Sequence, residues 1–178
     1  MNTVFSNQFF HIDDIKCLRF ESWWVENREK NQITVIFRLD GKPHEIIIKD
    51  TKYYVKEIYS GEKKNQGKAL SCWDLYVGCY IDIFGKCTIL KQCDLKTAEW
   101  NQFYGSFLTE MKNTFIEELK KYERKALDQK VTRNCSGRGQ CQTNLRELMA
   151  QVTSLKHRMA QYRPLLSDDI IVAFESLL

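Results

Sequence analysis

The chain has 178 residues, of which 43% are hydrophobic and 28% charged, as in an ordinary globular protein with a packed core. Two prolines and eight glycines argue against long disordered linkers, so we expect one domain with extensions or two small domains. The net charge of +4 is too small to indicate a nucleic-acid binder, and no run approaches the roughly 20 apolar residues of a membrane span. We therefore predict no nucleic-acid partner and no membrane insertion.

Residues 1–12 contain three aromatic side chains, Phe5, Phe9 and Phe10, among small polar residues. Burial of each phenylalanine contributes roughly 1.5–3 kcal/mol, so leaving them in water is costly. We expect an N-terminal arm that either folds back on its own sheet or docks into a partner. The same residues lack the basic and apolar regions of a signal peptide.

Four runs of residues before position 60 are typical of strands, because apolar side chains recur at every second position or β-branched residues dominate. They cover 15–24, 33–39, 45–48 and 53–59. Short polar segments such as Asp40-Gly41 join them. Strands without intervening helices predict an antiparallel sheet or a small barrel.

The stretch from Trp73 to Trp100 is typical of a hairpin that belongs to the same sheet. Residues 77–84 alternate between an apolar row and larger side chains, and 87–93 return as the partner strand. We expect Gly85-Lys86 to be a two-residue type II′ turn in which Gly85 supplies the positive φ. Including this hairpin, we predict six or seven strands by Cys93.

After Asp94 the apolar period changes to that of helices, which we expect at about 105–131, 143–162 and 168–177. The second helix carries a heptad seam from Leu145 to Tyr162. The two long helices most simply pair as an antiparallel hairpin, although the seam is equally able to meet a partner. The predicted fold is therefore α+β, with an arm (1–12), a β domain (13–104) and a helical hairpin or extension (105–178).

The basic surplus of the chain lies in its C-terminal part, where residues 106–162 contain eleven Lys and Arg but six Asp and Glu. An acidic protein surface is a possible partner for it, and a solvated helix face is the alternative. The candidate contact residues on the helical part are Arg133, Arg138, Arg146, Lys156 and Arg158.

The sequence contains no complete catalytic or cofactor-binding motif. The glycines at 61 and 67 have five residues between them instead of the four of a phosphate-binding loop, and Ala69 stands where such a loop needs Ser or Thr. Seven cysteines, an odd number, lie within strand-like patterns and not at zinc-ligand or disulfide spacings. We predict no enzyme activity, cofactor or metal, and free, mostly buried thiols in a reducing compartment.

Several segments resemble the DM-ten domain. Leu18-Arg19-Phe20 with Trp24 and Arg28 is similar to its opening, and Asn65-Gln66-Gly67-Lys68 to its middle turn. The most characteristic run follows, as Asp74-Leu-Tyr-Val-Gly78, Ile83-Phe84-Gly85-Lys86 and Cys93-Asp94-Leu-Lys-Thr97, with Trp73 before it. The resemblance covers about residues 13–104.

This resemblance implies a β domain of pleckstrin-homology-like type that serves ciliary proteins as a non-catalytic module on tubulin inside doublet microtubules. Family members include EF-hand-containing proteins with three copies and an NDP-kinase homologue with one. In this chain a helical extension stands in place of the kinase domain or EF-hand loop. The resemblance further implies that Gly78 lets a strand bend or pack closely, that Cys93 is buried and that Asp94 caps backbone N–H groups.

We therefore expect a structural protein of the ciliary or flagellar axoneme, located in the cytoplasm and cytoskeleton. Its expected partners are α/β-tubulin and neighbouring microtubule inner proteins, contacted by the phenylalanine-rich arm and the basic helices. Two alternatives stay open. One is a cytosolic adaptor that uses the 145–162 seam as a coiled coil, and the other is a phosphoinositide-binding module suggested by fold analogy.

Overall fold

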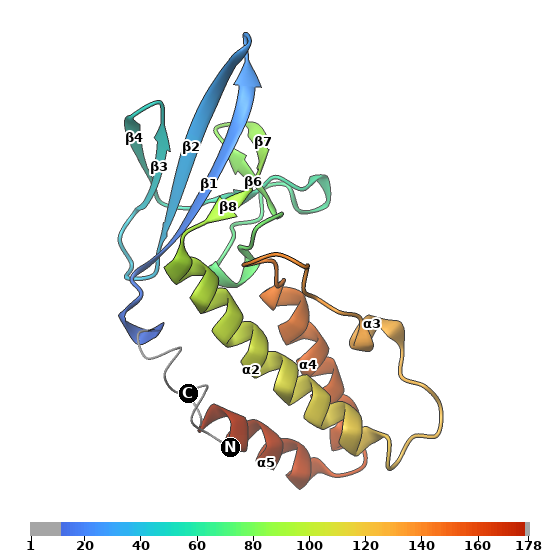
Figure 1. The fold of residues 1–178 in the computed structure, drawn as a ribbon. Helices are drawn as coiled ribbons and strands as arrows, with labels where there is room; N and C mark the ends of the chain where they lie inside the picture. Colours follow the sequence, from blue (N-terminus) through green and yellow to red (C-terminus); the bar gives the residue numbers. More distant parts are fainter. Residues whose placement is uncertain (1–11, 177–178) are drawn as a thin grey trace. The chain divides into compact units, whose positions relative to one another are not determined.

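The computed structural model describes residues 12–176 and has the predicted α+β fold, with antiparallel sheets followed by helices (Figure 1). The arm residues Phe5, Phe9 and Phe10 lie outside the described part. The chain forms two compact units. The first ends at Phe103 and takes in Gly137–Thr143, and the second comprises Tyr104–Ser136 and the described chain from Asn144 onward. Residues 137–143, which we had assigned to the helical extension, therefore belong to the β unit.

The first unit contains a five-stranded antiparallel sheet of order β4-β3-β2-β1-β8. Its strands are β1 (Cys17–Glu26), β2 (Glu29–Arg38), β3 (His44–Ile48), β4 (Thr51–Val55) and β8 (Gln92–Cys93). In Figure 1, β1 and β2 form one long hairpin, which pairs along its whole length from Cys17↔Arg38 to Glu26↔Glu29.

A second, three-stranded sheet of order β5-β6-β7 completes the unit, and neither sheet is closed into a barrel. Its strands are β5 (Tyr59–Ser60), β6 (Tyr80–Ile83) and β7 (Lys86–Ile89). The predicted return strand 87–93 is thus divided. Residues 86–89 pair with β6, whereas Gln92 and Cys93 leave that sheet and pair with β1. Short 3-10 turns at Ile12–Asp14, Lys63–Asn65 and Cys72–Asp74 precede or connect the strands.

The three two-residue hairpin loops share one geometry. Asn27-Arg28, Lys49-Asp50 and Phe84-Gly85 have positive φ at both positions, as a type I′ turn requires. The turn after β6 is therefore Phe84-Gly85 of type I′, and our assignment of Gly85-Lys86 to a type II′ turn was wrong by one residue. Type I′ turns match the right-handed twist of the strands that they connect.

The core of the first unit is apolar and combines alternate positions of the strands, as the period of two predicts, with residues of the connecting segments and of α2. It contains Leu18, Phe20, Ile33, Val35, Phe37, Ile46, Ile58, Leu75, Ile81, Ile83, Leu90 and Trp100, all buried.

Helix α2 (Leu95–Leu119) begins ten residues before the predicted start and ends twelve residues before the predicted end. Asp94 caps it, because its carboxylate accepts the Thr97 N–H at 2.9 Å. The helix ends where its apolar stripe stops being buried: Leu119 is fully buried, but Tyr122 is 37% exposed. Burial of such a stripe is what stabilises most helices in proteins.

Helix α4 (Leu145–Ala160) matches the predicted range within two residues at each end, and Asn144 is its N-cap. It runs parallel to α2, so the predicted antiparallel hairpin is wrong. Beyond the C-terminal ends of both helices, Tyr122 stacks on Tyr162 with ring centroids 5.3 Å apart. The segment that connects α2 to α4, which includes α3 (Gln129–Thr132), is long enough to bring the chain back to the N-terminal end of α2.

Helix α5 (Pro164–Glu175) begins four residues before the predicted start. Pro164 occupies the first turn of α5, where its missing N–H costs nothing. The buried Ser167 hydroxyl donates to the Lys156 carbonyl at 3.0 Å and holds α5 against α4.

Candidate functional site

The motif residues that carry the DM-ten resemblance form the joint between sheet, turn and helix. Cys93 pairs with Phe20 of β1, and Asp94 caps α2. The Thr97 hydroxyl then accepts the Arg19 N–H of β1 at 2.8 Å. The run Cys-Asp-x-x-Thr therefore fixes the start of α2 against β1, a structural role.

The other motif residues have structural roles as well. The Asp74 carboxylate accepts both the N–H and the hydroxyl of Ser71, at 2.9 and 3.1 Å, which closes a 3-10 turn. Gly78 has φ of +109°, and a Cβ there would meet nothing closer than 3.9 Å. The positive φ of the backbone therefore explains why this position is a glycine, and close packing does not. Trp73 stacks on Trp100 with centroids 5.1 Å apart.

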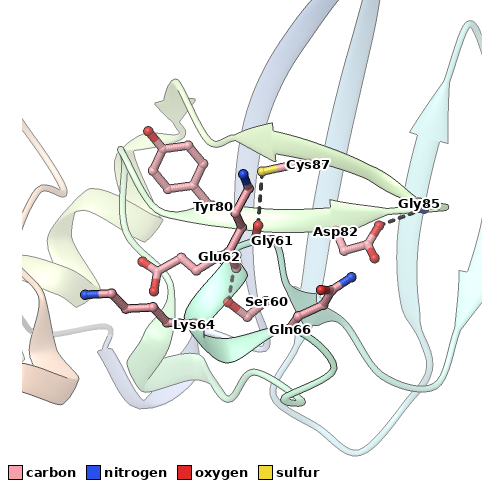
Figure 2. Close-up of a pocket in the computed structure, with 10 residues that line it drawn as sticks. Ser60, Gly61, Glu62, Lys64, Gln66, Tyr80, Asp82, Gly85 and Cys87 are labelled. Carbon is pink, nitrogen blue, oxygen red and sulfur yellow. Dashed lines mark hydrogen bonds between the residues drawn. The ribbon is translucent and has the colours of Figure 1, made fainter.

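An open pocket of about 710 Å³ lies beside the loop that superficially resembles a phosphate-binding loop (Figure 2). It is lined by Ser60, Gly61, Glu62, Lys63, Lys64, Gln66, Tyr80, Asp82, Gly85 and Cys87. The Cys87 thiol donates to the Gly61 carbonyl at 3.2 Å, and Asp82 accepts the Gly85 N–H at 2.7 Å. A Cβ on Gly61 would lie 2.7 Å from the Ile81 carbonyl oxygen, so close strand packing explains this glycine.

The thiols differ in exposure and protonation. Cys79 and Cys141 are buried, four others are half-buried and Cys87 is exposed, so our expectation of mostly buried thiols was wrong. Burial raises the pKa of Cys79 to about 12. The Cys141 thiol donates to the Thr97 carbonyl at 3.9 Å. Its interaction with the neighbouring Cys93 lowers the pKa of Cys93 and raises that of Cys141. All seven cysteines are free.

The five candidate basic residues do not form one patch. Arg138 belongs to the first unit and the other four to the second. Three of those four form ion pairs within their own unit: Arg133 with Glu147, Lys156 with Asp168 at 3.6 Å, and Arg158 with Glu123 at 2.8 Å. Arg138 is exposed and has no ion pair among the residues that the structure describes.

The apolar side chains of the predicted coiled-coil seam are buried, except for Tyr162 at its end, which is 42% exposed. Leu145, Leu148, Val152, Leu155 and Met159 are all buried. The seam therefore presents no free apolar row to a second chain.

A groove of about 550 Å³ between β1 and β7 is the feature that sequence reasoning missed. We call it the β1–β7 groove. Its walls are Trp23, Trp24, Val25 and Glu26 from β1, and Lys86, Cys87, Thr88, Ile89 and Lys91 from β7 and the residues after it.

Lysines surround the two indoles of the β1–β7 groove. The ammonium groups of Lys30 and Lys91 lie 4.2 and 4.4 Å from the ring centroid of Trp23, and that of Lys86 lies 4.7 Å from Trp24. Such cation–π contacts hold the lysines at the groove. The adjacent tryptophans were the available signal, but the lysines come from two separate places in the sequence, Lys30 from β2 and Lys86 and Lys91 from β7 and the residues after it.

No known protein-family model matches the chain, and no curated protein matches it either. The DM-ten resemblance therefore stays a prediction from the motif residues. Among residues 12–176, no three His, Cys, Asp or Glu side chains gather in a way that could hold a metal ion. None of the helices in this part of the chain is long and apolar enough to cross a bilayer.

Proposed function

We propose that the protein is a non-catalytic structural component of the ciliary or flagellar axoneme, where its β unit binds tubulin in the lumen of the doublet microtubule. The partner and the location come from the DM-ten resemblance. Support from the described residues is that the motif side chains stabilise turns and a helix start instead of converging on a pocket. A static binding module needs this rigidity and no reacting group.

The observation that carries the proposal is an exposed apolar surface on the β unit. Phe84, at the tip of the β6–β7 hairpin, is 60% exposed and contacts Tyr53 of β4 edge-to-face at 5.2 Å. Tyr54 is 66% exposed and Tyr53 is 43% exposed. Clustered aromatic side chains at a surface mark protein interaction sites, because burying them against a partner removes apolar surface from water. Tyr54 follows Tyr53 in β4 and therefore points to the opposite face, so we name the pair Tyr53 and Phe84 the aromatic patch.

The arm and the basic residues remain proposed contacts with tubulin or neighbouring inner proteins. Arg138 is the basic residue best suited to this role, since it has no ion pair among the described residues. Arg146 lies on the exposed side of α4. Reversing the charge of Arg133, Lys156 or Arg158 would break an ion pair within the protein, so these three give a less specific test than Arg138.

Co-assembly with tubulin tests the proposal. The purified protein is added either before or after tubulin polymerises, and the microtubules are pelleted. A lumenal binder is expected in the pellet mainly when it is present during assembly. Phe84→Ser with Tyr53→Ser should reduce the pelleted fraction, whereas Tyr54→Ser, at an exposed aromatic on the opposite face of β4, serves as control. Equal pelleting of all variants would contradict the role of the aromatic patch.

A further inference from the structure

We propose that the β1–β7 groove binds an extended, acidic segment of a partner protein, which adds as a strand to the open edge of β1. The inference rests on the pairing of β1 and on the lysines of the groove. It is independent of the axonemal proposal, because it concerns the chemistry of the partner segment and holds for any partner.

The first observation is that β1 has an unpaired edge over its last residues. On the side away from β2, the Arg19 and Glu21 carbonyls accept the Asp94 and Lys91 N–H groups at 3.3 and 3.0 Å. Strand β8 pairs only with Phe20 and Glu21, so no strand continues along β1 beyond them. Backbone groups alternate along an antiparallel strand, and the next odd residues therefore point their N–H and C=O groups to the same side.

Trp23 and Val25 are these odd residues. The Trp23 carbonyl accepts the Lys91 ammonium at 2.8 Å, which shows that it faces the groove. Among the described residues, the Trp23 N–H and the N–H and C=O of Val25 have no hydrogen-bond partner outside the β2 ladder. An extended segment that pairs with an exposed edge satisfies such groups, and this is a recurrent mode of peptide binding.

The opposite wall is also a strand edge, because β7 is the outer strand of its sheet. The two walls meet at one end, where the buried Ser22 hydroxyl donates to the Ile89 carbonyl. Val25 is 71% exposed, so the β1 edge is accessible. The groove therefore offers backbone pairing along β1 and side-chain contacts from β7.

The second observation is charge. Lys30 and Lys91 contact the Trp23 ring and have no carboxylate partner among residues 12–176. Lys86 pairs with Glu26 at 2.8 Å, but both side chains are about half exposed and can exchange partners. Lys86 and Lys91 line the groove and Lys30 adjoins it at the Trp23 ring, and these ammonium groups select for carboxylates on the incoming segment.

Two other occupants fit less well. Residues 1–11 of this chain contain no Asp or Glu and cannot complement the lysines. A second copy that pairs the same edge by two-fold symmetry would place lysines against lysines. Membranes and nucleic acids carry negative charge but cannot extend a β-sheet.

The test uses the full chain and a fluorescent peptide that alternates glutamate and valine. A glutamate–proline peptide of equal length and charge is the matched probe, because it cannot form a strand ladder. A lysine–valine peptide tests the charge requirement. We expect the glutamate–valine peptide to bind at least about tenfold more tightly than either control, the effect of one or two backbone hydrogen bonds.

Variants of the protein complete the test. Val25→Pro removes the outward N–H and leaves the β2 ladder intact, and Val25→Thr is its control. Val25→Pro is expected to weaken binding of the glutamate–valine peptide about tenfold relative to Val25→Thr. Lys30→Gln with Lys91→Gln should weaken it while preserving the circular dichroism spectrum, which keeps the test valid if the proline variant unfolds.

Three results would overturn the inference. Equal binding of the glutamate–valine and glutamate–proline peptides would reduce the groove to a charged patch. Self-association that Val25→Pro abolishes would make a second copy the occupant. Tighter binding to phosphatidylserine vesicles than to the peptide, unaffected by Val25→Pro, would indicate a membrane surface. None of these results bears on co-assembly with tubulin through the aromatic patch.

Discussion

The Thr97 hydroxyl gives the sharpest prediction about the fold, because one atom joins α2 to β1. It accepts the Arg19 N–H at 2.8 Å, across 78 residues of sequence, and Thr97 itself is 1% exposed. Thr97→Val keeps the shape of the side chain but removes the acceptor. The Arg19 N–H is then left without its partner, which costs about 1–2 kcal/mol of unfolding free energy at a partly buried site.

Urea unfolding followed by tryptophan fluorescence measures this loss, since Trp100 lies one turn further along α2. With a slope of about 2 kcal/mol per molar urea, the midpoint should fall by about 0.5–1 M. Thr109→Val, at an exposed position of the same helix, is the matched control and should leave the midpoint near that of the wild type. Faster amide exchange at Arg19 should accompany the loss.

The reasoning is refuted if Thr97→Val unfolds at the same urea concentration as Thr109→Val with unchanged slope. A lower midpoint without faster exchange at Arg19 would also count against it, because the destabilisation would then come from packing and not from the hydrogen bond.

Three further predictions concern the first unit. Gly85→Ala should cost only about 1 kcal/mol of unfolding free energy and leave the fold intact, because φ is +88° but a Cβ meets nothing within 4 Å; thermal unfolding measures it, and outright unfolding would contradict it. The Arg38 guanidinium holds the pKa of Asp40 at about 2, below its usual 3.8. The stabilisation from this ion pair is therefore complete above about pH 4 and is lost as the pH falls through 2. In a plot of melting temperature against pH, Asp40→Asn should show a shallower fall at acid pH than the wild type. An unchanged fall would show that the ion pair does not contribute to stability. Maleimide should label the exposed Cys87 thiol first and the buried Cys79 and Cys141 thiols last, since the pKa of each buried thiol is raised, that of Cys79 to about 12 by burial; mass spectrometry of timed samples gives the order, and early labelling of either buried thiol would contradict its burial.

Local patterns predicted the elements whose determinants are local. Alternation predicted β1 and β2 because Leu18, Phe20, Ile33 and Val35 face one core. The seam of α4 was predicted for the same reason, at the helical period. The spacing of these residues along the chain is therefore enough to indicate that they are buried.

Features that depend on distant partners were missed. Asp94 was read as a cap, yet α2 was predicted to start ten residues later, because its first turn faces β1 through Thr97 and not through an apolar stripe. The parallel course of α2 and α4 depends on Tyr122 meeting Tyr162, which spacing does not reveal. Cys93 leaves its hairpin for β1, a pairing between positions far apart in sequence.

The same distinction between local and distant determinants applies to the candidate site. The motif residues were identified from sequence, but their structural roles required the hydrogen bonds of Asp74 and Asp94. The basic residues were identified by composition, which does not reveal that Arg133 and Arg158 have acidic partners nearby in space. The β1–β7 groove was not predicted, because the lysines around Trp23 come from β2 and from the segment after β7.

The central claim is that this protein is a structural component of the doublet microtubule lumen. Its most direct test is a difference map between cryo-electron microscopy reconstructions of doublets from ciliated cells with and without the gene. The account predicts periodic difference density on the lumenal wall that fits the β unit, with the aromatic patch against tubulin. Identical lumenal density in both maps, with the protein recovered in the detergent-soluble extract, would contradict it.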